Sequence, residues 1–491
     1  MKKLTLLLAV LFFLASCIKI ENQEKMALQP DIFPDYKSVT IPPNIAPLTF
    51  TVKGAKRLVA DFLLGDSVAF RAVGAGKEGV CISEKKWKNL LKNSKGQRFS
   101  VRVYTQTADN KWQEFLPFDV FVAPDTIDAY VSYRLIKPDY EQADRMGLYQ
   151  RDITTFDEKT IIENLQLNSK DKFGCVNCHS YCNYNADTMM YHARFVDVGT
   201  VVVKGDEAKK LNLTINDMGK GTYPAWHPSA AYIAFSMNET MQVFHVFDDN
   251  RISVYDTKSD LMLYDVQKKE AIFDKRFLNS PELETFPSWS PDGEFLYFSS
   301  AKMSAEIPLN NDKIRYGIYR IRFDEKTATF GDSVECIVDA DVTHKTQLFA
   351  RVSPDNRYLL YTEADYGTFP IWHHEADLRM IDLQNGKHVD MSALNSASTE
   401  SYHAWSSNGR WIVFSSRRID GLYTRLYLAY FDKNGIVHKP FLMPQKTADF
   451  DLLRMKSYNV PEFSKNAVRR SKRQMRQIQA EAAEPVKVRY Q

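Results

Sequence analysis

Two cysteines three residues apart, followed at once by a histidine, form the stretch of this chain with the most specific chemistry. Cys175, Cys178 and His179 have the spacing CxxCH, which is the spacing of covalent haem c attachment. The two thiols would add to the haem vinyl groups, and His179 would become the proximal iron ligand. The sequence therefore predicts one covalent haem c on these three residues.

Two other interpretations of the CxxCH stretch stay open. A structural zinc site needs four ligands, usually from two such cysteine pairs, and the sequence holds no second CxxC. A relic motif or a disulfide between Cys175 and Cys178 is the other alternative. We take haem as the main hypothesis because the chain begins with an export signal, described below.

A haem iron also needs a sixth ligand or an open position. His192 lies 13 residues after His179 and is the first candidate for the distal ligand, although a packed role in a β-hairpin competes with it. A methionine ligand would raise the potential, a histidine would lower it, and an open site would permit ligand binding. The further candidates, for which core, surface or turn roles are expected, are Met189, Met190, His227, His373, His374 and His403.

Residues 1–17 read as a lipoprotein signal peptide. Lys2 and Lys3 precede an apolar core over residues 4–15, which is too short to span a membrane. The Leu-Ala-Ser-Cys stretch at 14–17 then resembles a bacterial lipobox. This resemblance implies cleavage before Cys17 and a lipid anchor on that cysteine, with an ordinary signal peptide as the alternative. The expected location is the cell envelope, with the outer membrane favoured, on its periplasmic or surface side.

The composition limits the other classes. The 64 basic and 61 acidic residues give a net charge of +3, so no nucleic-acid partner is expected. A length of 491 residues favours more than one domain, and no other stretch is apolar enough to span a membrane. Cys81, Cys182 and Cys336 form an odd set, so at least one of these thiols is free or bridges to another molecule.

The first domain is predicted over residues 30–124. Short alternating segments at 48–53, 57–64, 67–73, 99–106 and 115–122 predict a small β-sandwich of immunoglobulin-like kind. A connecting segment over 125–186 follows and carries the CxxCH motif. A helix is predicted over 157–165, because Ile161, Ile162 and Leu165 share one helical face.

Residues 187–463 repeat one hairpin pattern. Its clearest copy places a Trp-Ser-Pro-Asp-Gly turn at 289–293 between two strands. Related copies are centred on Ser229, Asp355 and Asn408, with a degenerate copy at Asp187. Repeats of this length predict a propeller of five to six blades, so the protein is expected to be mostly β. The last blade would be closed by chain after Pro440 or before Cys175. Asp292 and Asp355 are expected to form turns and to take no part in catalysis.

These hairpins resemble the blades of TolB-like, WD-repeat-related propellers. The order of lipobox, small β-domain, CxxCH, a Met-Met-Tyr-His-Ala-Arg stretch at 189–194 and blades further resembles envelope lipoproteins labelled cytochrome-c-related or TolB-like. The resemblance implies the fold and says little about function. Two copies depart from the pattern, since residues 226–230 lack the Asp-Gly turn and Val352 replaces a tryptophan.

The main functional hypothesis is a monohaem c electron carrier or redox sensor with a redox or envelope protein partner at the propeller face. The alternative is a non-enzymatic scaffold that binds an envelope protein or glycan, with the haem structural or absent. A haem peroxidase is a third, weaker hypothesis, and no hydrolase motif occurs. Residues 464–491 form a basic C-terminal tail, expected to be solvated, with a helix that contacts anionic lipid or an acidic partner as the alternative.

Overall fold

The computed structural model describes residues 18–137, 146–164, 175–215, 220–246, 250–278, 280–303 and 309–491. The predicted signal peptide, with Cys17, lies outside these residues. The chain divides into two compact units. Unit 1 comprises the chain up to Ile127 with Ile153–Phe156 and His438–Met455, and unit 2 comprises Asp128–Asp152, Asp157–Val437 and Lys456–Gln491.

Unit 1 is built on a mixed sheet of eight strands, in the order β1-β9-β8-β5-β6-β7 with β10 beside β8 and β3 beside β10. Its strands are β1 (Glu24–Lys25), β3 (Thr40–Ile41), β5 (Arg57–Leu64), β6 (Ser67–Ala75), β7 (Gly79–Cys81), β8 (Arg98–Gln106), β9 (Trp112–Glu114) and β10 (Phe118–Val122). Two short strands, β2 (Ile32–Phe33) and β4 (Thr51–Val52), pair with each other. The return segment adds β33 (Phe441–Leu442) and α5 (Phe450–Leu453).

One helix of unit 1, α2 (Glu84–Ser94), was not predicted from the sequence. It buries Trp87, whose ring lies 6.0 Å from that of Phe62 and 5.8 Å from that of Phe99. Its indole N–H donates to the carbonyl of Ile45 at 2.9 Å. The predicted strands at 57–64, 67–73 and 99–106 are confirmed by β5, β6 and β8, whereas the immunoglobulin-like sandwich stays a prediction.

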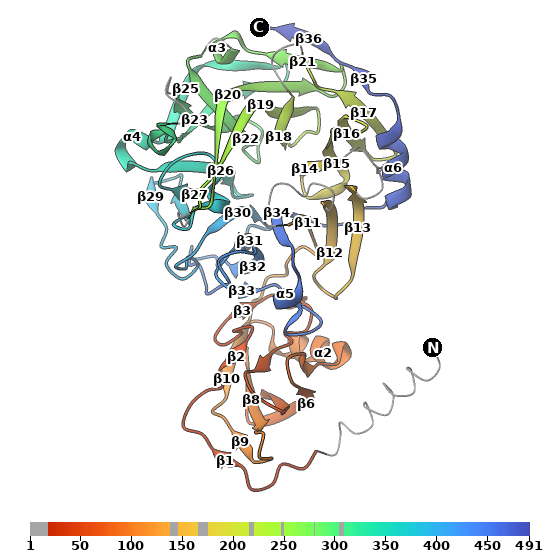
Figure 1. Cartoon of the computed structure of the whole chain (residues 1–491), viewed down its shortest axis with the longest axis vertical. Coiled ribbons are helices and arrows are strands. Elements are labelled where there is room, and N and C mark those ends of the chain that lie inside the picture. The colour runs from red at the N-terminus through yellow and green to blue at the C-terminus, as the bar shows by residue number, and fades with distance from the viewer. Residues whose placement is uncertain are drawn as a thin grey trace. The chain divides into compact units, whose positions relative to one another are not determined.

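Unit 2 is a β-propeller with six blades in the part of the chain that is described (Figure 1). Blade 1 has β14 (Cys175–Cys182), β15 (Asn185–Arg194), β16 (Gly199–Lys204) and β17 (Glu207–Asn212). Blade 2 has β18 (Gly221–Trp226), β19 (Tyr232–Phe244), β20 (Ile252–Asp265) and β21 (Glu270–Phe273). Blade 3 has β22 (Glu282–Trp289), β23 (Phe295–Lys302), β24 (Gly317–Asp324) and β25 (Thr329–Val338). Blade 4 has β26 (Thr346–Val352), β27 (Tyr358–Ala364), β28 (Asp377–Asp382) and β29 (Lys387–His388), and blade 5 has β30 (Glu400–Trp405), β31 (Trp411–Ser416) and β32 (Arg425–Tyr430).

The closing blade joins the two ends of the propeller sequence. Its inner strand is β34 (Ser457–Ser464), which pairs with β11 (Tyr130–Ile136), followed by β12 (Gly147–Asp152) and β13 (Glu158–Glu163). In Figure 1, blue β34 lies beside yellow-brown β11. Both segments named as possible closures therefore contribute to the sixth blade. The antiparallel pairing of β34 with β11 seals the ring through backbone hydrogen bonds.

The predicted helix over 157–165 is wrong, because its described part contains the strand β13. The β-branched run Thr160, Ile161 and Ile162 favours a strand over a helix. Ile162 pairs with Leu148 of β12, and both isoleucines are buried. Leu165 lies outside the described residues.

The repeated turns hold the blades as predicted. In blade 3, the Ser290 hydroxyl donates to Asp292 at 2.5 Å and accepts from the backbone N–H of Phe295 at 2.9 Å. The same bonds recur at Ser353, where Asp355 is the acceptor. The side chains of Asp292 and Asp355 thus fix hairpin turns.

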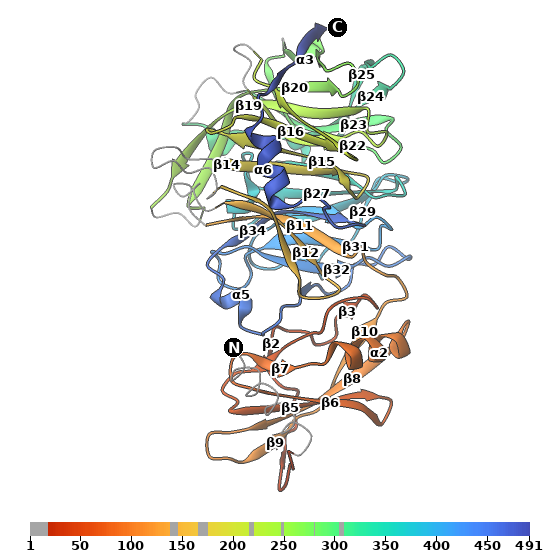
Figure 2. The same ribbon diagram turned by 90° about the vertical axis from the view of Figure 1, so that its right-hand side faces the viewer.

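The predicted solvated tail is corrected by an ordered strap on the rim of the propeller. Ser471 and Gln474 form a capping box that starts α6 (Lys472–Ala480), and Met475 is fully buried. Two further strands, β35 (Glu484–Pro485) and β36 (Lys487–Tyr490), extend blades 1 and 2 in parallel to β17 and β21. Figure 2 shows α6 crossing the strands of blade 1. The strap covers sheet edges that would otherwise be open to other chains.

Candidate functional site at the propeller channel

Each inner strand carries one residue in the left-handed backbone conformation. The six residues, with φ from 45° to 58°, are Cys178, Tyr223, Phe286, Phe349, Tyr402 and Val460. Each sits where the pairing register of its strand shifts. Such bulges re-aim side chains, so these six positions are equivalent around the channel.

The CxxCH motif is therefore part of blade 1 and does not precede it, which corrects the predicted boundary at residue 187. Cys175–Cys182 is the inner strand β14. The hairpin to β15 turns at Asn183 and Tyr184, both with positive φ, as in a two-residue hairpin turn. The turn predicted at Asp187 lies inside β15, because blade 1 lacks the longer Ser-Pro-Asp turn of its neighbours.

The inner strands line a cavity of about 810 Å³. One wall is aromatic and comes from blades 2 to 5. The ring centroids of Tyr223 and Phe286 lie 4.5 Å apart, those of Phe286 and Phe349 4.3 Å, and those of Phe349 and Tyr402 5.1 Å. The volume lies within the range of small-molecule and cofactor sites.

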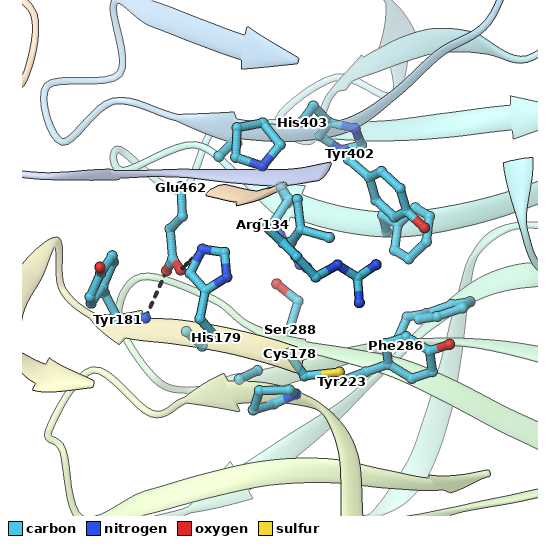
Figure 3. Close-up of a pocket in the computed structure, with 18 of the residues that line it drawn as sticks. Arg134, Cys178, His179, Tyr181, Tyr223, Phe286, Ser288, Tyr402, His403 and Glu462 are labelled. Carbon is cyan, nitrogen blue, oxygen red and sulfur yellow. Dashed lines mark hydrogen bonds and ion pairs between the residues drawn. The ribbon is translucent and has the colours of Figure 1, made fainter. Parts of the chain in front are cut away.

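Three arginines also line the cavity. Arg134, Arg194 and Arg351 line the cavity and are partly buried. The Arg134 guanidinium donates to the side-chain oxygens of Asn177 in β14 and Asn459 in β34. Figure 3 shows this guanidinium pointing into the space near Tyr402 and Cys178.

His179 is buried beside a carboxyl group. Its Nε2 lies 3.9 Å from Glu462 Oε2 and has no hydrogen-bond partner in the described chain. Burial, together with the positive charge of Arg134, lowers the pKa of His179 to about 4. A hydrogen bond to the Ser132 backbone favours the charged form and offsets part of this effect. Glu462 accepts the Tyr181 backbone N–H at 2.9 Å, and burial raises its pKa to about 8. At neutral pH the imidazole is therefore neutral and the carboxyl is mostly protonated.

The two motif cysteines have different surroundings. Cys178 lines the cavity, and its sulfur is visible there in Figure 3. Cys175 is buried, with its Sγ 3.8 Å from the Sδ of Met146, and Met146 lines the cavity. Burial raises the pKa of Cys175, against the field of Arg134 and Arg194. No disulfide joins any of the described cysteines, Cys81, Cys182 and Cys336 included.

His192 lies in β15, opposite Asn177, and is not among the residues that line the cavity. Its Nδ1 lies 2.7 Å from Thr200 Oγ1, and its ring packs 5.8 Å from that of Phe235 in blade 2. Burial lowers its pKa to about 3. Of the two roles predicted for His192, the geometry favours the packed one.

The other candidates for the sixth ligand are hydrogen-bonded, packed or outside the cavity. His403 lines the cavity, and its Nδ1 and Nε2 lie 3.4 Å from Thr362 Oγ1 and 3.1 Å from Leu360 O. Elsewhere, His227 and His373 are hydrogen-bonded, Met189 and Met190 lie in hydrophobic clusters, and His374 is exposed. Within the described chain, His179 is thus the cavity histidine with a free ring nitrogen.

Two of the three motif residues have the surroundings that a haem c would need. Cys178 and His179 face one cavity of suitable size, and the unpaired Nε2 belongs to a neutral imidazole, the form that binds a metal. The ring is oriented by its hydrogen bond to the Ser132 backbone, as metal-binding histidines are oriented by a hydrogen bond from their other ring nitrogen. Cys175 is not among the residues that line the cavity, and Met146 lies beside its sulfur.

Sequence reasoning missed Arg134, Glu462 and the aromatic wall. A usable signal was present, since an aromatic residue stands three positions before Trp226, Trp289 and Trp405. The same spacing places Cys178 three positions before Tyr181. Aligning this column would have placed the motif on an inner strand. Arg134 has no such signal, because it reaches the channel from the second strand of the closing blade.

Comparison with protein families and with curated proteins finds no match. Solved structures with low similarity include prolyl oligopeptidase B from Galerina marginata, at 8% identity and TM-score 0.37, over 70% of this chain and 42% of that one. An oligogalacturonate lyase from Vibrio parahaemolyticus matches at 11% identity and TM-score 0.32, over 59% of this chain and 85% of that one. A puromycin-hydrolysing peptidase from Mycobacterium tuberculosis matches at 11% identity and TM-score 0.35, over 83% of this chain and 57% of that one. The chain thus spans half or less of the first peptidase structures it matches.

Two features are not found over the described residues. No helix there has the length and apolar character needed to cross a membrane. No three side chains of histidine, cysteine, aspartate or glutamate in that part of the chain gather as a metal site.

Proposed function

We propose that the protein is a lipid-anchored haem c protein of the cell envelope, which transfers electrons or senses redox state. Its single haem would be held by Cys178, Cys175 and His179 in the channel of a TolB-like propeller, and Cys17 would carry the lipid. The observation that supports this most is that Cys178 and His179 face one cavity and that Nε2 of His179 has no partner. When bound, haem c supplies a one-electron couple.

The chain's own residues would do three things for such a group. His179 is kept neutral by burial and can therefore offer its Nε2 lone pair. The aromatic wall from Tyr223 to Tyr402 would exclude water from one side of the group. Glu462, held by the Tyr181 N–H, stays near the imidazole as a mostly protonated carboxyl group.

Maturation with a haem c assembly system tests the proposal. We expect the wild type to gain the mass of one haem, with a pyridine haemochrome spectrum of covalent haem, and the Cys175→Ala, Cys178→Ala double variant to gain none. Because Cys178 faces the cavity, Cys175→Ala should retain more haem than Cys178→Ala. The matched control is Cys182→Ala, because Cys182 lies on the same strand but in the core between blades 1 and 2. This variant should keep its haem. Wild-type protein without covalent haem would contradict the proposal.

One observation favours the alternative of a binding scaffold. The hairpin of β19 and β20 is the longest of the described propeller hairpins, and Thr240 and Gln242 reach the cavity. Met241 and Phe244, 53% and 44% exposed, lie on the same strand. Exposed apolar side chains mark a protein contact where they form a contiguous patch, and these two would contribute to one on this hairpin. The scaffold is supported if the mature protein is colourless and if Phe244→Asp abolishes binding of an envelope partner. The control Lys326→Asp, in an exposed turn of blade 3, should leave that binding unchanged.

A further inference from the structure

The cavity holds a surplus of positive charge. No ion pair joins Arg134, Arg194 or Arg351 to a carboxylate within the described chain, and Glu462 is the sole acidic residue among those that line the cavity. Partly buried cations that have no opposite charge beside them are costly. Such a set favours an anionic occupant.

Arg134 is held in place for such an anion. Nη1 and Nη2 each donate to an asparagine oxygen, Asn177 on one side and Asn459 on the other. A guanidinium has five N–H donors, so three remain, and the Nε–H is buried without a partner. The two asparagines lie in neighbouring inner strands and restrict the rotamers of Arg134. A prepared guanidinium loses less entropy on binding a carboxylate.

The aromatic wall lies in the same cavity as the arginines. Tyr223, Phe286, Phe349 and Tyr402 form a continuous series of ring contacts, and Phe286 and Phe349 are buried. A flat aromatic ligand would gain from stacked or edge contacts with such a surface. Small inorganic anions would leave this wall unused.

We propose that the cavity binds a planar aromatic dicarboxylate, with its carboxylates on Arg134 and the other two cavity arginines and its ring on the aromatic wall. This inference rests on the proposed function for the identity of the ligand, a porphyrin. It goes beyond that function because the recognition is non-covalent and does not need the thiols or an iron.

The test uses a metal-free porphyrin, so that His179 cannot contribute by ligation. The full chain, made without haem c assembly, is titrated with protoporphyrin IX and with its dimethyl ester, following the shift of the porphyrin absorption. We expect the diacid to bind at least about tenfold more tightly than the ester, and Arg134→Gln to remove most of that difference, because hydrogen bonds to charged groups are the strong ones. Arg322→Gln, an exposed arginine of β24, should change nothing.

Two further variants keep the test decisive. Since Arg134 also links β14 to β34, thermal unfolding is recorded for each variant, and Arg194→Gln and Arg351→Gln repeat the measurement if Arg134→Gln does not fold. Equal affinity of the wild type for diacid and ester overturns the inference, even if covalent haem forms. Preference for the diacid in a protein that never gains covalent haem supports the inference and rejects the proposed covalent attachment.

Discussion

A single backbone conformation determines which motif residue faces the channel. Cys178 shares the left-handed bulge with five other inner-strand residues, four of them aromatic. Non-glycine residues in this conformation cost about 1–3 kcal/mol each and persist only where their surroundings enforce it, as the repeated bulge does in every blade. Blade 1 thus places a thiol where four other blades place an aromatic ring. The next residue, His179, occupies the position of Pro224 and Pro287 in the neighbouring blades.

The structure separates the two roles predicted for His192. Replacing His192 with Ala removes the Thr200 contact and the packing on Phe235, so we expect a loss of about 2–4 kcal/mol in the free energy of unfolding. If the wild type carries haem, the visible spectrum of the variant should be unchanged. Denaturant unfolding and the spin state are measured on the same sample. A changed spin state with normal stability would restore His192 as the distal ligand.

Among the secondary-structure elements, the hairpins built on the repeated Ser-Pro-Asp turn were predictable from the sequence. The elements that depart from this repeat were not. The Ser-Pro-Asp turns fix their hairpins through their own side chains, so their sequence was enough to locate the blades. Blade 1 uses a two-residue turn at Asn183 and Tyr184, and extrapolating the repeat therefore misplaced the motif. The partner strand β12, which decides the conformation of Ile161 and Ile162, cannot be read from their local periodicity.

The C-terminal strap was missed for a related reason. Its basic residues suggest a solvated segment, yet the apolar face of α6 is short and depends on one buried methionine, Met475. Partners for β35 and β36 lie more than 200 residues away in blades 1 and 2. Such long-range strand additions leave no pattern in the local sequence.

The contribution of the strap to the stability of the propeller can be tested directly. Met475 is fully buried in the cluster with Val176 and Tyr191, so Met475→Ala should lower the free energy of unfolding by about 2–5 kcal/mol. Arg473→Ala, an exposed neighbour on the same helix, should change it by less than about 0.5 kcal/mol. Chemical denaturation of both variants measures this difference. Equal, small effects would show that α6 adds little to the stability of the propeller.

The propeller buries both histidines and carboxyl groups, and these two kinds of group have opposite effects on how stability changes with pH. Burial lowers the pKa of His179 to about 4 and those of His192 and His403 to about 3, so the unfolded chain takes up protons first and stability falls as pH drops below about 6.5. Burial raises the pKa of Asp256 to about 7 and that of Glu284 to about 8. These carboxyl groups keep their protons in the folded state, so their contribution falls as pH rises toward 8.

Above pH 6.5 the histidines are neutral in both states, which leaves the carboxyl groups in control of the pH dependence. We expect the free energy of unfolding to fall between pH 6.5 and 8.5, and Glu284→Gln to flatten that fall, because a buried neutral amide has no proton to lose. Glu284 is 3% exposed and its Oε2 has no hydrogen-bond partner among the described residues, so its ionisation is not offset by a nearby donor at that atom. The measurement is urea unfolding of wild type, Glu284→Gln and the exposed-turn control Glu294→Gln at pH 6.5 and 8.5. The control should follow the wild type, and a Glu284→Gln variant with the same pH slope as the wild type would show that Glu284 is already ionised in the folded protein at pH 6.5.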